Sequence, residues 1–555
     1  MEYYYSSEKS VQMLVYLLKA HKIRKVIVSP GTTNITFVAS IQQDPYFEVY
    51  SSVDERSAAY MACGLAAESG EPVVISCTGA TASRNYVPAL TEAFYRKLPV
   101  LAVTSTQHTG KIGQLVPQVI DRSNIQNDIA VMSVDIPIIY DWEDEWSCNV
   151  KLNSALLALR HKGGGPVHIN LTTTHSKDFS VKTLPEFRVI QRITLEDEMP
   201  RISSSRVGIF VGSHLKWSEA LTNAVEKFCE LYNGVVLCDH TSNYRGKYRI
   251  QYSLLSNQSN HHYESEHVEL LIDMGEVSGA YFFMRPKEVW RVNPDGVVRD
   301  KFKTALTKLF EMSELQFFTR LNDITGEPRP TDFYRELREE YDRIISCVPE
   351  LPFSNTWIAK TTTPKLPKHS VLHLGILNSL RCWNLFEMSE TISCYANTGG
   401  FGIDGTVSAL IGASLADTTK LHFIVVGDLA FFYDMNSVGN RHVGRNIRIL
   451  LVNNGLGTEF RNYNNYLAAQ VGEDVNKFIA AEGHYGRKSS VLVKHYAEDL
   501  GFTYLSANNK EEFINSLAQF VDPHLSEKPI LFEVFTDAED ESEALRILNE
   551  LVGNS

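Results

Sequence analysis

The chain has 555 residues, of which 44% are hydrophobic and 21% are charged, and its formal net charge is −13 with a pI near 5.8. This length exceeds what one hydrophobic core organises, so we expect about three domains of an ordinary globular protein. The acidic balance argues against a surface for nucleic acid or anionic membranes, and no uncharged apolar run is long enough to span a bilayer.

The N-terminal segment and the cysteines indicate the compartment. The chain does not begin with a basic segment followed by an apolar one, so we expect no signal peptide. The eight cysteines are scattered without a C-x-x-C pair, and most lie inside apolar runs. Reduced thiols buried in a core are typical of such a pattern. We therefore predict a cytoplasmic protein.

The first block of the chain alternates apolar strand-like runs with helical patterns. Residues 11–22 have helical spacing, and an alanine-rich helix is predicted over residues 56–69, closed by Gly70. The predicted strands of this block lie at residues 25–31, 47–55, 72–79, 100–106 and 161–174. This alternation is typical of βαβ units and predicts a parallel sheet.

Two further blocks follow, separated by polar segments. Residues 175–206 contain prolines and predict a linker, and a second boundary is predicted near residue 350. The strand-like runs of these blocks lie at residues 206–213, 234–240, 268–276, 288–296, 370–379, 420–428, 448–454 and 529–537. We therefore predict an α/β protein of three consecutive domains with open, mostly parallel sheets, at residues 1–180, 181–350 and 351–555.

Polar residues follow two strand-like runs of the last block. Gly427 and Asp428 come directly after one run, and Asn453 and Asn454 end another, followed by Gly-Leu-Gly. Open parallel sheets bind ligands outside the carboxyl ends of their strands, glycines let the backbone approach a diphosphate, and oxygen ligands suit Mg²⁺. Either half alone is more typical of a solvated loop or an Asn-Gly turn. Both halves together predict a diphosphate and magnesium site.

Two other segments carry weaker signals by themselves. Glu55 lies at a strand-to-helix junction, where a carboxylate also simply stabilises a helix N-terminus. Residues 397–414 (NTGGFGIDGTVSALIGAS) have closely spaced glycines before a helical run, which alone predicts no more than a turn.

Taken together, these segments resemble the thiamine-diphosphate (ThDP)-dependent enzymes over essentially the whole chain. SPGTTN (residues 29–34), Glu55 on its small-residue helix and the run from Cys77 match in order the pyrimidine-binding domain of that superfamily. The GD and NN halves match its diphosphate-binding motif, one residue closer together than usual. The resemblance implies a pyrimidine-binding domain, a central Rossmann-like domain and a diphosphate-binding domain, with ThDP and Mg²⁺ as cofactors.

The resemblance also implies residue roles. Glu55 would contact the aminopyrimidine ring, where a carboxylate hydrogen-bonded to N1′ favours the imino tautomer whose nitrogen takes the proton from thiazolium C2. Ile403 would lie under the bent cofactor, and Gln118 matches a glutamine near the reacting centre, although a surface glutamine fits equally well. The implied metal ligands are Asp428, Asn454 and the backbone carbonyl of Leu456, with Asn453 as a substitute. The other implied cofactor contacts are Pro30, Thr78, Asn378, Ser379, Gly402, Gly427, Leu429, Ala430 and Gly457.

Within the superfamily, the GIDG string, the GDL form of the metal motif and DERSA around Glu55 are most similar to the menaquinone-pathway synthases, which join decarboxylated 2-oxoglutarate to isochorismate. Those enzymes hold carboxylate-rich substrates with arginines. Here Thr33 and Asn34 stand where the family has an S-R-S string, and Gln107, Thr398 and Trp383 stand where it has arginines. Arg381 is the nearby candidate for a compensating arginine. The missing cations predict different and less anionic substrates.

The predicted function is ThDP- and Mg²⁺-dependent decarboxylation of a 2-oxo acid, followed by transfer of the acyl carbanion to a second small molecule. The alternatives are a simple decarboxylase that releases an aldehyde, a non-catalytic scaffold of the same fold and a dinucleotide oxidoreductase. The scaffold is disfavoured because Glu55, Ile403, Asp428 and Asn454 are all present, and the oxidoreductase because residues 207–213 lack G-x-G-x-x-G. Since the superfamily's cofactor bridges two subunits, the resemblance implies a homodimer or a homotetramer.

Overall fold

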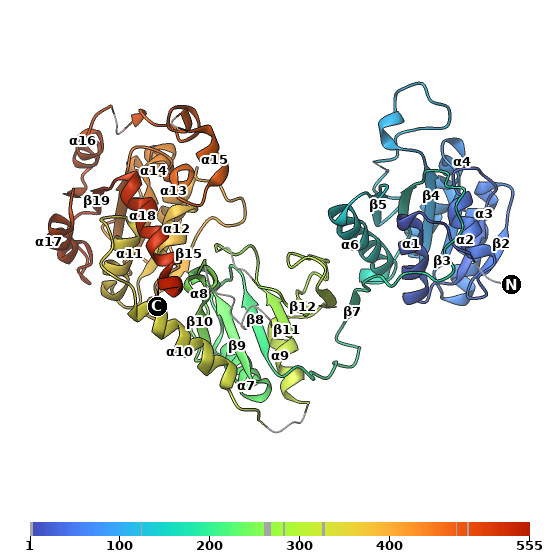
Figure 1. Ribbon diagram of the computed structural model, residues 1–555, viewed down its shortest axis with the longest axis horizontal. Coiled ribbons are helices and arrows are strands. Elements are labelled where there is room, and N and C mark those ends of the chain that lie inside the picture. Colours follow the sequence, from blue (N-terminus) through green and yellow to red (C-terminus); the bar gives the residue numbers. More distant parts are fainter. Residues whose placement is uncertain are drawn as a thin grey trace. The chain divides into compact units, whose positions relative to one another are not determined.

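The computed structural model describes residues 4–123, 125–259, 268–280, 284–324, 328–472, 474–485 and 488–554. They form two compact units (Figure 1), of which the first comprises Met1–Glu198 with Asn293–Met312 and the second Met199–Val292 with Ser313–Ser555. Among the described residues, no helix is both long enough and apolar enough to cross a membrane. All eight cysteines are free, and seven of them are buried.

The first unit is built on a parallel sheet with the strand order β2-β1-β3-β4-β6-β5. Its strands are β1 (Lys25–Val28), β2 (Glu48–Ser51), β3 (Val73–Cys77), β4 (Val100–Thr106), β5 (Met132–Ile136) and β6 (Val167–Thr172). Its helices are α1 (Lys9–Ala20), α2 (Ile35–Gln42), α3 (Glu55–Ser69), α4 (Thr81–Asn85), α5 (Val87–Arg96) and α6 (Trp142–Ala158). Every residue of β3 and β4 is buried, as expected for strands covered on both faces.

Helix α3 illustrates how local sequence fixes an element of this unit. It begins where the Asp54 side chain accepts a hydrogen bond from the backbone N–H of Ser57, and it ends at Gly70, whose φ is +67°. Its alanine-rich face packs into a core cluster with α5 and the central strands, while α1 and α6 contribute to a separate cluster. The predicted helix therefore agrees with the structure to within one residue at its start.

The segment predicted as a linker, residues 175–206, contains a short strand. This strand, β7 (Gln191–Ile193), pairs in parallel with β13 (Leu306–Phe310), which belongs to the same compact unit. A strand of three residues is too short to produce a periodic signal, so the sequence pattern did not reveal it.

The second unit contains the strands β8–β12 of the central block and the whole of the last sheet. The central strands follow the order β10-β9-β8-β11-β12 and are all parallel. They are β8 (Val207–Val211), β9 (Gly234–Cys238), β10 (Arg249–Gln251), β11 (Leu270–Met274) and β12 (Glu288–Val292), with helices α7 (Glu219–Tyr232), α8 (Tyr252–Ser256), α9 (Glu314–Asn322) and α10 (Asp332–Ser346).

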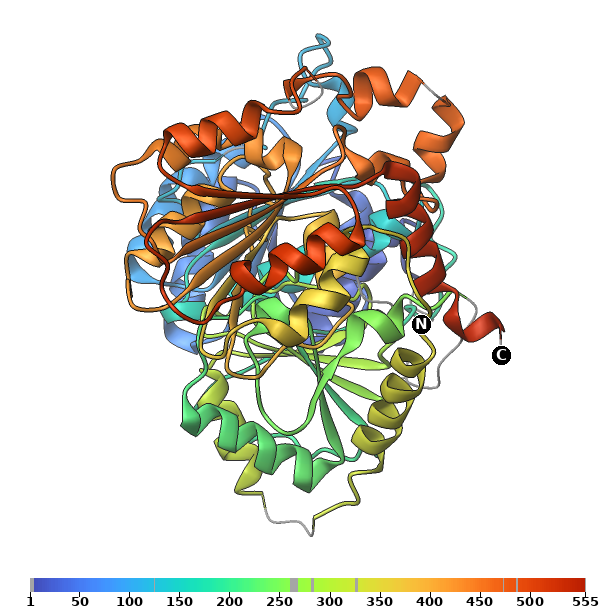
Figure 2. The same ribbon diagram turned by 90° about the vertical axis from the view of Figure 1, so that its left-hand side faces the viewer.

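The last sheet has the order β15-β14-β16-β17-β19-β18, again entirely parallel, with helices on both faces (Figure 2). Its strands are β14 (Val371–Leu374), β15 (Ser393–Tyr395), β16 (His422–Gly427), β17 (Ile447–Asn453), β18 (Thr503–Ala507) and β19 (Ile530–Phe535). Its helices are α11 (Asn355–Thr362), α12 (Asn378–Trp383), α13 (Thr406–Ser414), α14 (Asp428–Tyr433), α15 (Tyr466–Val471), α16 (Leu492–Asp499), α17 (Lys510–Phe520) and α18 (Ala538–Asn549).

The three sheets confirm the predicted fold class of consecutive α/β blocks with parallel sheets. Strands β1–β6 lie in residues 1–180, β7–β13 in 181–350 and β14–β19 in 351–555. The two compact units divide the chain differently, and the three domain boundaries stay a prediction.

Candidate active site

The carboxyl edge of the last sheet brings the two halves of the predicted diphosphate motif together. Strands β16 and β17 are parallel neighbours, so Asp428 after one and Asn454 after the other come to the same edge. Asp428 is buried, and its Oδ1 accepts a hydrogen bond from the backbone N–H of Leu429 at 2.8 Å. Its Oδ2 accepts one from the backbone N–H of Gly455 at 2.7 Å, which joins the two halves directly.

The two adjacent asparagines have different surroundings. The Nδ2 of Asn453 donates to Oε1 of Glu533 on β19 at 2.7 Å, and the hydroxyl of Tyr504 donates to Oε2 of the same carboxylate at 2.8 Å. Burial raises the pKa of Glu533. The side chain of Asn453 is thus bound to Glu533 on β19, and Asn454 is the better candidate of the two for a metal ligand.

The residues at this edge fit a metal that is shared with a diphosphate. Asp428, Asn454 and the carbonyl of Leu456 are all oxygen donors, the ligand type that Mg²⁺ prefers. In the described part of the chain, no group of three or more His, Cys, Asp or Glu side chains could hold a metal without further ligands. A Cβ atom placed on Gly427 would meet nothing within 4 Å, so the space beside this strand end is open.

The glycine-rich segment before α13 lies next to this edge. Ile403 is half-buried and packs against the hydrophobic cluster that includes Ala430 and Phe431 of α14. Ile403 therefore packs on the same hydrophobic cluster as the helix that begins with Asp428.

Asn378 and Ser379 lie at the N-terminus of α12 and connect to the segment that follows Gly457. The Nδ2 of Asn378 donates to Oγ1 of Thr458 at 2.5 Å, and its Oδ1 accepts from Nη1 of Arg381 at 2.8 Å. Ser379 is buried, and its Oγ accepts from Nδ2 of Asn355 at 3.3 Å. These bonds hold α12 close to the loop that carries the second half of the motif.

In the first unit, the predicted residues gather at the carboxyl ends of β1, β3 and β4. The hydroxyls of Thr33 and Thr78 are 2.5 Å apart. A Cβ on Gly31 would lie 2.5 Å from the Cβ of Thr78, and one on Gly79 would lie 2.8 Å from the carbonyl oxygen of Gln118. The backbone at Gln118 therefore packs against the Thr78 segment, while its side chain is exposed.

Glu55 is the first residue of α3, as predicted, and is half-buried. Its Oε2 accepts a long hydrogen bond, 3.5 Å, from Nδ2 of Asn85 at the end of α4. Pro30 is exposed in the turn between β1 and α2. Both residues are thus accessible at the carboxyl edge of the first sheet.

Strained backbone marks several of these segments. Ala80, Gln118, Leu377 and Phe401 have φ values of +55°, +65°, +66° and +52°. A side chain in this region costs about 1–3 kcal/mol, and such strain persists where the surrounding structure imposes it, often at functional sites. Each of these residues is itself a predicted site residue or lies within two positions of one.

The segments predicted to lack the family's arginines carry no cationic side chain at the predicted positions. Thr33, Asn34, Trp383 and Thr398 are buried, and Gln107 accepts a hydrogen bond from Lys111 at 2.7 Å. The indole of Trp383 donates to Oδ1 of Asn355 inside the protein. Arg381 does not replace these arginines as a cation for a substrate carboxylate, because both of its terminal nitrogens bind the carboxylate of Glu459.

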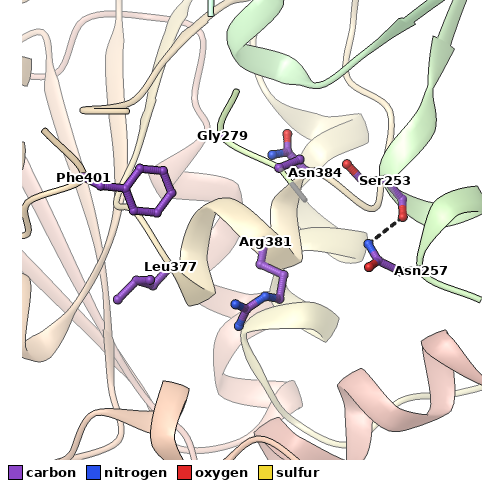
Figure 3. A pocket seen from close by; sticks show the side chains of 8 residues that line it. Ser253, Asn257, Gly279, Leu377, Arg381, Asn384 and Phe401 are labelled. Atoms are coloured by element: carbon purple, nitrogen blue, oxygen red, sulfur yellow. Dashed lines mark hydrogen bonds between the residues drawn. The ribbon is translucent and has the colours of Figure 1, made fainter. Parts of the chain in front are cut away.

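A small pocket lies beside these elements in the second unit (Figure 3), with a cavity volume of about 30 Å³ for a water-sized sphere. Its lining comprises Ser253, Asn257, Gly279, Ala280, Leu377, Arg381, Asn384 and Phe401. The sequence pattern pointed to Leu377 and Phe401 only through their neighbours Asn378 and Gly402. The sequence pattern did not point to Glu459, which pairs with Arg381. The two residues are 78 positions apart, so no local pattern links them.

Arg122 is a second residue that the sequence pattern did not single out. It is 3% exposed, and its Nη2 donates to the carbonyl of Ser105 at 3.2 Å, next to Gly79. Burial lowers its pKa to about 10. Its guanidinium therefore lies beneath the segment that carries Thr78.

The chain is similar to known proteins over its whole length. Residues 9–125 match the family described as thiamine pyrophosphate enzyme, N-terminal TPP binding domain. A 2-succinyl-5-enolpyruvyl-6-hydroxy-3-cyclohexene-1-carboxylate synthase of Bacteroides fragilis is 33% identical, and one of Phocaeicola vulgatus 32%, each match covering 98% of both chains. A Rhodococcus jostii RHA1 thiamine diphosphate-dependent 4-hydroxybenzoylformate decarboxylase aligns with a TM-score of 0.41 and 15% identity, covering 95% of this chain and 99% of its own. The chain belongs to the family of thiamine-diphosphate-dependent enzymes that includes these synthases.

Proposed function

We propose that this chain is a ThDP- and Mg²⁺-dependent enzyme that decarboxylates a small 2-oxo acid and passes the remaining acyl group to a second small molecule. The observation that carries the proposal is the sheet edge at which Asp428 binds the backbone N–H of Gly455 beside the open space at Gly427. An oxygen donor set next to an unobstructed glycine suits a metal-bound diphosphate.

The proposed roles follow from the placement of the side chains. When bound, ThDP supplies a nucleophilic carbon and then an electron sink for the decarboxylated fragment. Glu55 holds a proton at the pyrimidine ring, and Ile403 supplies the apolar surface against which the cofactor rests. Asp428, Asn454 and the Leu456 carbonyl hold Mg²⁺. Gln118 orients the substrate, and the remaining proposed cofactor contacts are Pro30, Thr78, Asn378, Ser379, Gly402, Gly427, Leu429, Ala430 and Gly457.

The substrates are proposed to carry fewer carboxylates than those of the relatives. The synthases are named for a succinyl-bearing cyclohexene carboxylate product. In this chain Thr33, Gln107, Trp383 and Thr398 are neutral, all of them except Gln107 are buried, and Arg381 is already paired. Bidentate arginines are the usual means of holding carboxylates, and their absence here favours a less anionic donor or acceptor.

We also propose that the active unit is at least a homodimer in the cytoplasm, with the cofactor bridging two subunits. The outer face of α3, the helix that begins with Glu55, carries Tyr60 and Met61, each 47% exposed, and Val53 before the helix is 79% exposed. Exposed apolar residues that cluster at one site commonly mark a protein interface.

The proposal is tested by measuring CO2 release from a panel of 2-oxo acids, with and without ThDP and Mg²⁺, for the wild type and Glu55→Gln. Release that requires both cofactors and is lost in the variant supports the proposal and identifies the donor. Product analysis with added aldehydes or ketones then separates acyl transfer from simple aldehyde release. No release from any acid, together with no rise in melting temperature on adding ThDP, would refute the proposal and favour a non-catalytic scaffold.

A further inference from the structure

A buried carboxylate lies where α11, α18 and the end of β19 meet in the second unit. Helix α11 packs against both α12 and α18 (Figure 1). Glu541, in the first turn of α18, is 5% exposed. Both of its carboxylate oxygens accept from the backbone N–H of Asn355, the first residue of α11, at 3.0 Å. Its Oε1 also accepts from the hydroxyl of Thr536, directly after β19, at 2.7 Å.

Asn355 connects this carboxylate to α12. Its Nδ2 donates to Oγ of Ser379 at 3.3 Å, and its Oδ1 accepts from Nε1 of Trp383 at 3.0 Å. An indole N–H only donates, so this bond fixes which end of the amide faces Ser379. Because the Oγ of Ser379 accepts from Asn355, its own O–H remains able to donate to another acceptor. An oxygen of a diphosphate is such an acceptor.

Thr536 connects the same carboxylate to the second half of the diphosphate motif. Its backbone N–H donates to the carbonyl of Asn453 at 3.2 Å, and Asn453 directly precedes Asn454. The carboxylate of Glu541 is therefore bonded, through one residue on each side, to the segment of Ser379 and to the segment of Asn454.

A buried acceptor at this junction is difficult to replace. The first N–H groups of α11 have no acceptor within the helix, and a helix N-terminus favours a negative charge. Without the carboxylate, the N–H of Asn355 and the hydroxyl of Thr536 would lose their acceptor inside the protein, which is costly. Both groups would have to move to find new partners, and the residues bonded to them would move as well.

We propose that Glu541 is a positioning residue for the diphosphate of the cofactor. It acts through Asn355 on the hydroxyl of Ser379, and through Thr536 on the strand end that precedes Asn454. The proposal rests on the proposed function, because that function assigns Ser379 and Asn454 to the cofactor site. Removing the carboxylate should therefore weaken ThDP binding and not only the stability of the fold.

The test measures the affinity of the full-length protein for ThDP by titration calorimetry at a fixed, saturating Mg²⁺ concentration. Glu541→Leu removes both acceptor oxygens and nearly keeps the volume, so ThDP should bind at least about tenfold more weakly than to the wild type. Glu541→Gln should restore the affinity to within about threefold, because an amide oxygen can accept the N–H of Asn355 and the amide NH2 can donate to the hydroxyl oxygen of Thr536.

A second variant tests the connection to α12 without changing the carboxylate. Asn355→Ala keeps the backbone N–H on Glu541 and loses the bond to Ser379, and it should also weaken ThDP binding about tenfold. In the double variant Glu541→Leu/Asn355→Ala the two losses should not multiply, because both act through the same bond to Ser379.

The matched control is Asp273→Asn, which alters a buried carboxylate that pairs with Arg291 between β11 and β12 of the central sheet. It should lower the melting temperature and leave the ThDP affinity within about threefold of the wild type. If Glu541→Leu or Asn355→Ala melts at a lower temperature but binds ThDP as the wild type does, the inference is wrong and the proposed function stands. If the wild type itself binds no ThDP, the proposed function fails with it.

Discussion

Replacing Asp428 with Asn tests the diphosphate edge directly. The carboxylate accepts backbone N–H groups from Leu429 and Gly455 at 2.8 and 2.7 Å, and hydrogen bonds to a charged group contribute about 1.5–3 kcal/mol each. The amide of Asn can keep one of these bonds, while its NH2 group faces the other N–H donor. The variant also removes the only charged oxygen donor among the proposed Mg²⁺ ligands.

Both bonds are present without the cofactor, so losing one lowers the stability of this edge by about 2 kcal/mol. The weaker affinity for ThDP follows from the loss of the charged Mg²⁺ ligand, and we expect it to fall at least about tenfold. The assay is a ThDP titration followed by intrinsic fluorescence at a fixed Mg²⁺ concentration, repeated over a Mg²⁺ series. The control is Asp417→Asn, which alters a carboxylate 39% exposed on the surface of the same unit. A variant at Asp428 that binds ThDP within threefold of the wild type, with the same Mg²⁺ dependence, would refute the assignment of this edge as the cofactor site.

Three further predictions concern other parts of the chain. Glu55→Gln should keep ThDP affinity within about threefold while lowering turnover at least about 100-fold, because a positioned proton-transfer group contributes on that order; equal losses in binding and turnover would argue for a structural role. Burial raises the pKa of Glu541 from 4.5 to about 7, so its protonated form stabilises the folded state below pH 4.5 and this contribution is lost as the pH rises through about 7. The melting temperature should therefore fall between pH 5 and pH 8, and Glu541→Gln should flatten that slope in parallel calorimetric scans. Gly31→Ala should lower the melting temperature, by the equivalent of about 1–3 kcal/mol, because the new Cβ would lie 2.5 Å from the Cβ of Thr78. The control is Gly64→Ala, whose new Cβ meets nothing within 4 Å and which should leave the melting temperature unchanged.

The parts of the fold that were predictable are those with long apolar runs. Strands such as β4 and β17 are buried along their whole length and appear as continuous hydrophobic segments in the sequence. The joining of Asp428 with Gly455 was predictable for the same reason, because residues that follow neighbouring parallel strands must meet at one edge. The cofactor roles of the individual side chains stay predictions.

The parts that were not predictable depend on contacts between distant residues or on very short elements. The strands β7 and β15 have three residues each and show no period. The pairing of Arg381 with Glu459 joins α12 to a turn far along the chain, and the sequence offers no reason to link the two. The hypothesis that Arg381 substitutes for a lost substrate arginine came from the sequence. It could be judged only from the structure, which shows the carboxylate of Glu459 beside Arg381.

The bonds from Asn378 to Thr458 and from Arg381 to Glu459 fasten α12 to the turn that follows the second half of the diphosphate motif. A ligand that displaces this turn therefore also acts on the helix that carries Asn378 and Ser379. Binding at the two places is then thermodynamically linked. Because such linkage is reciprocal, the factor by which the coenzyme changes the affinity for a ligand at the turn equals the factor by which that ligand changes the affinity for the coenzyme.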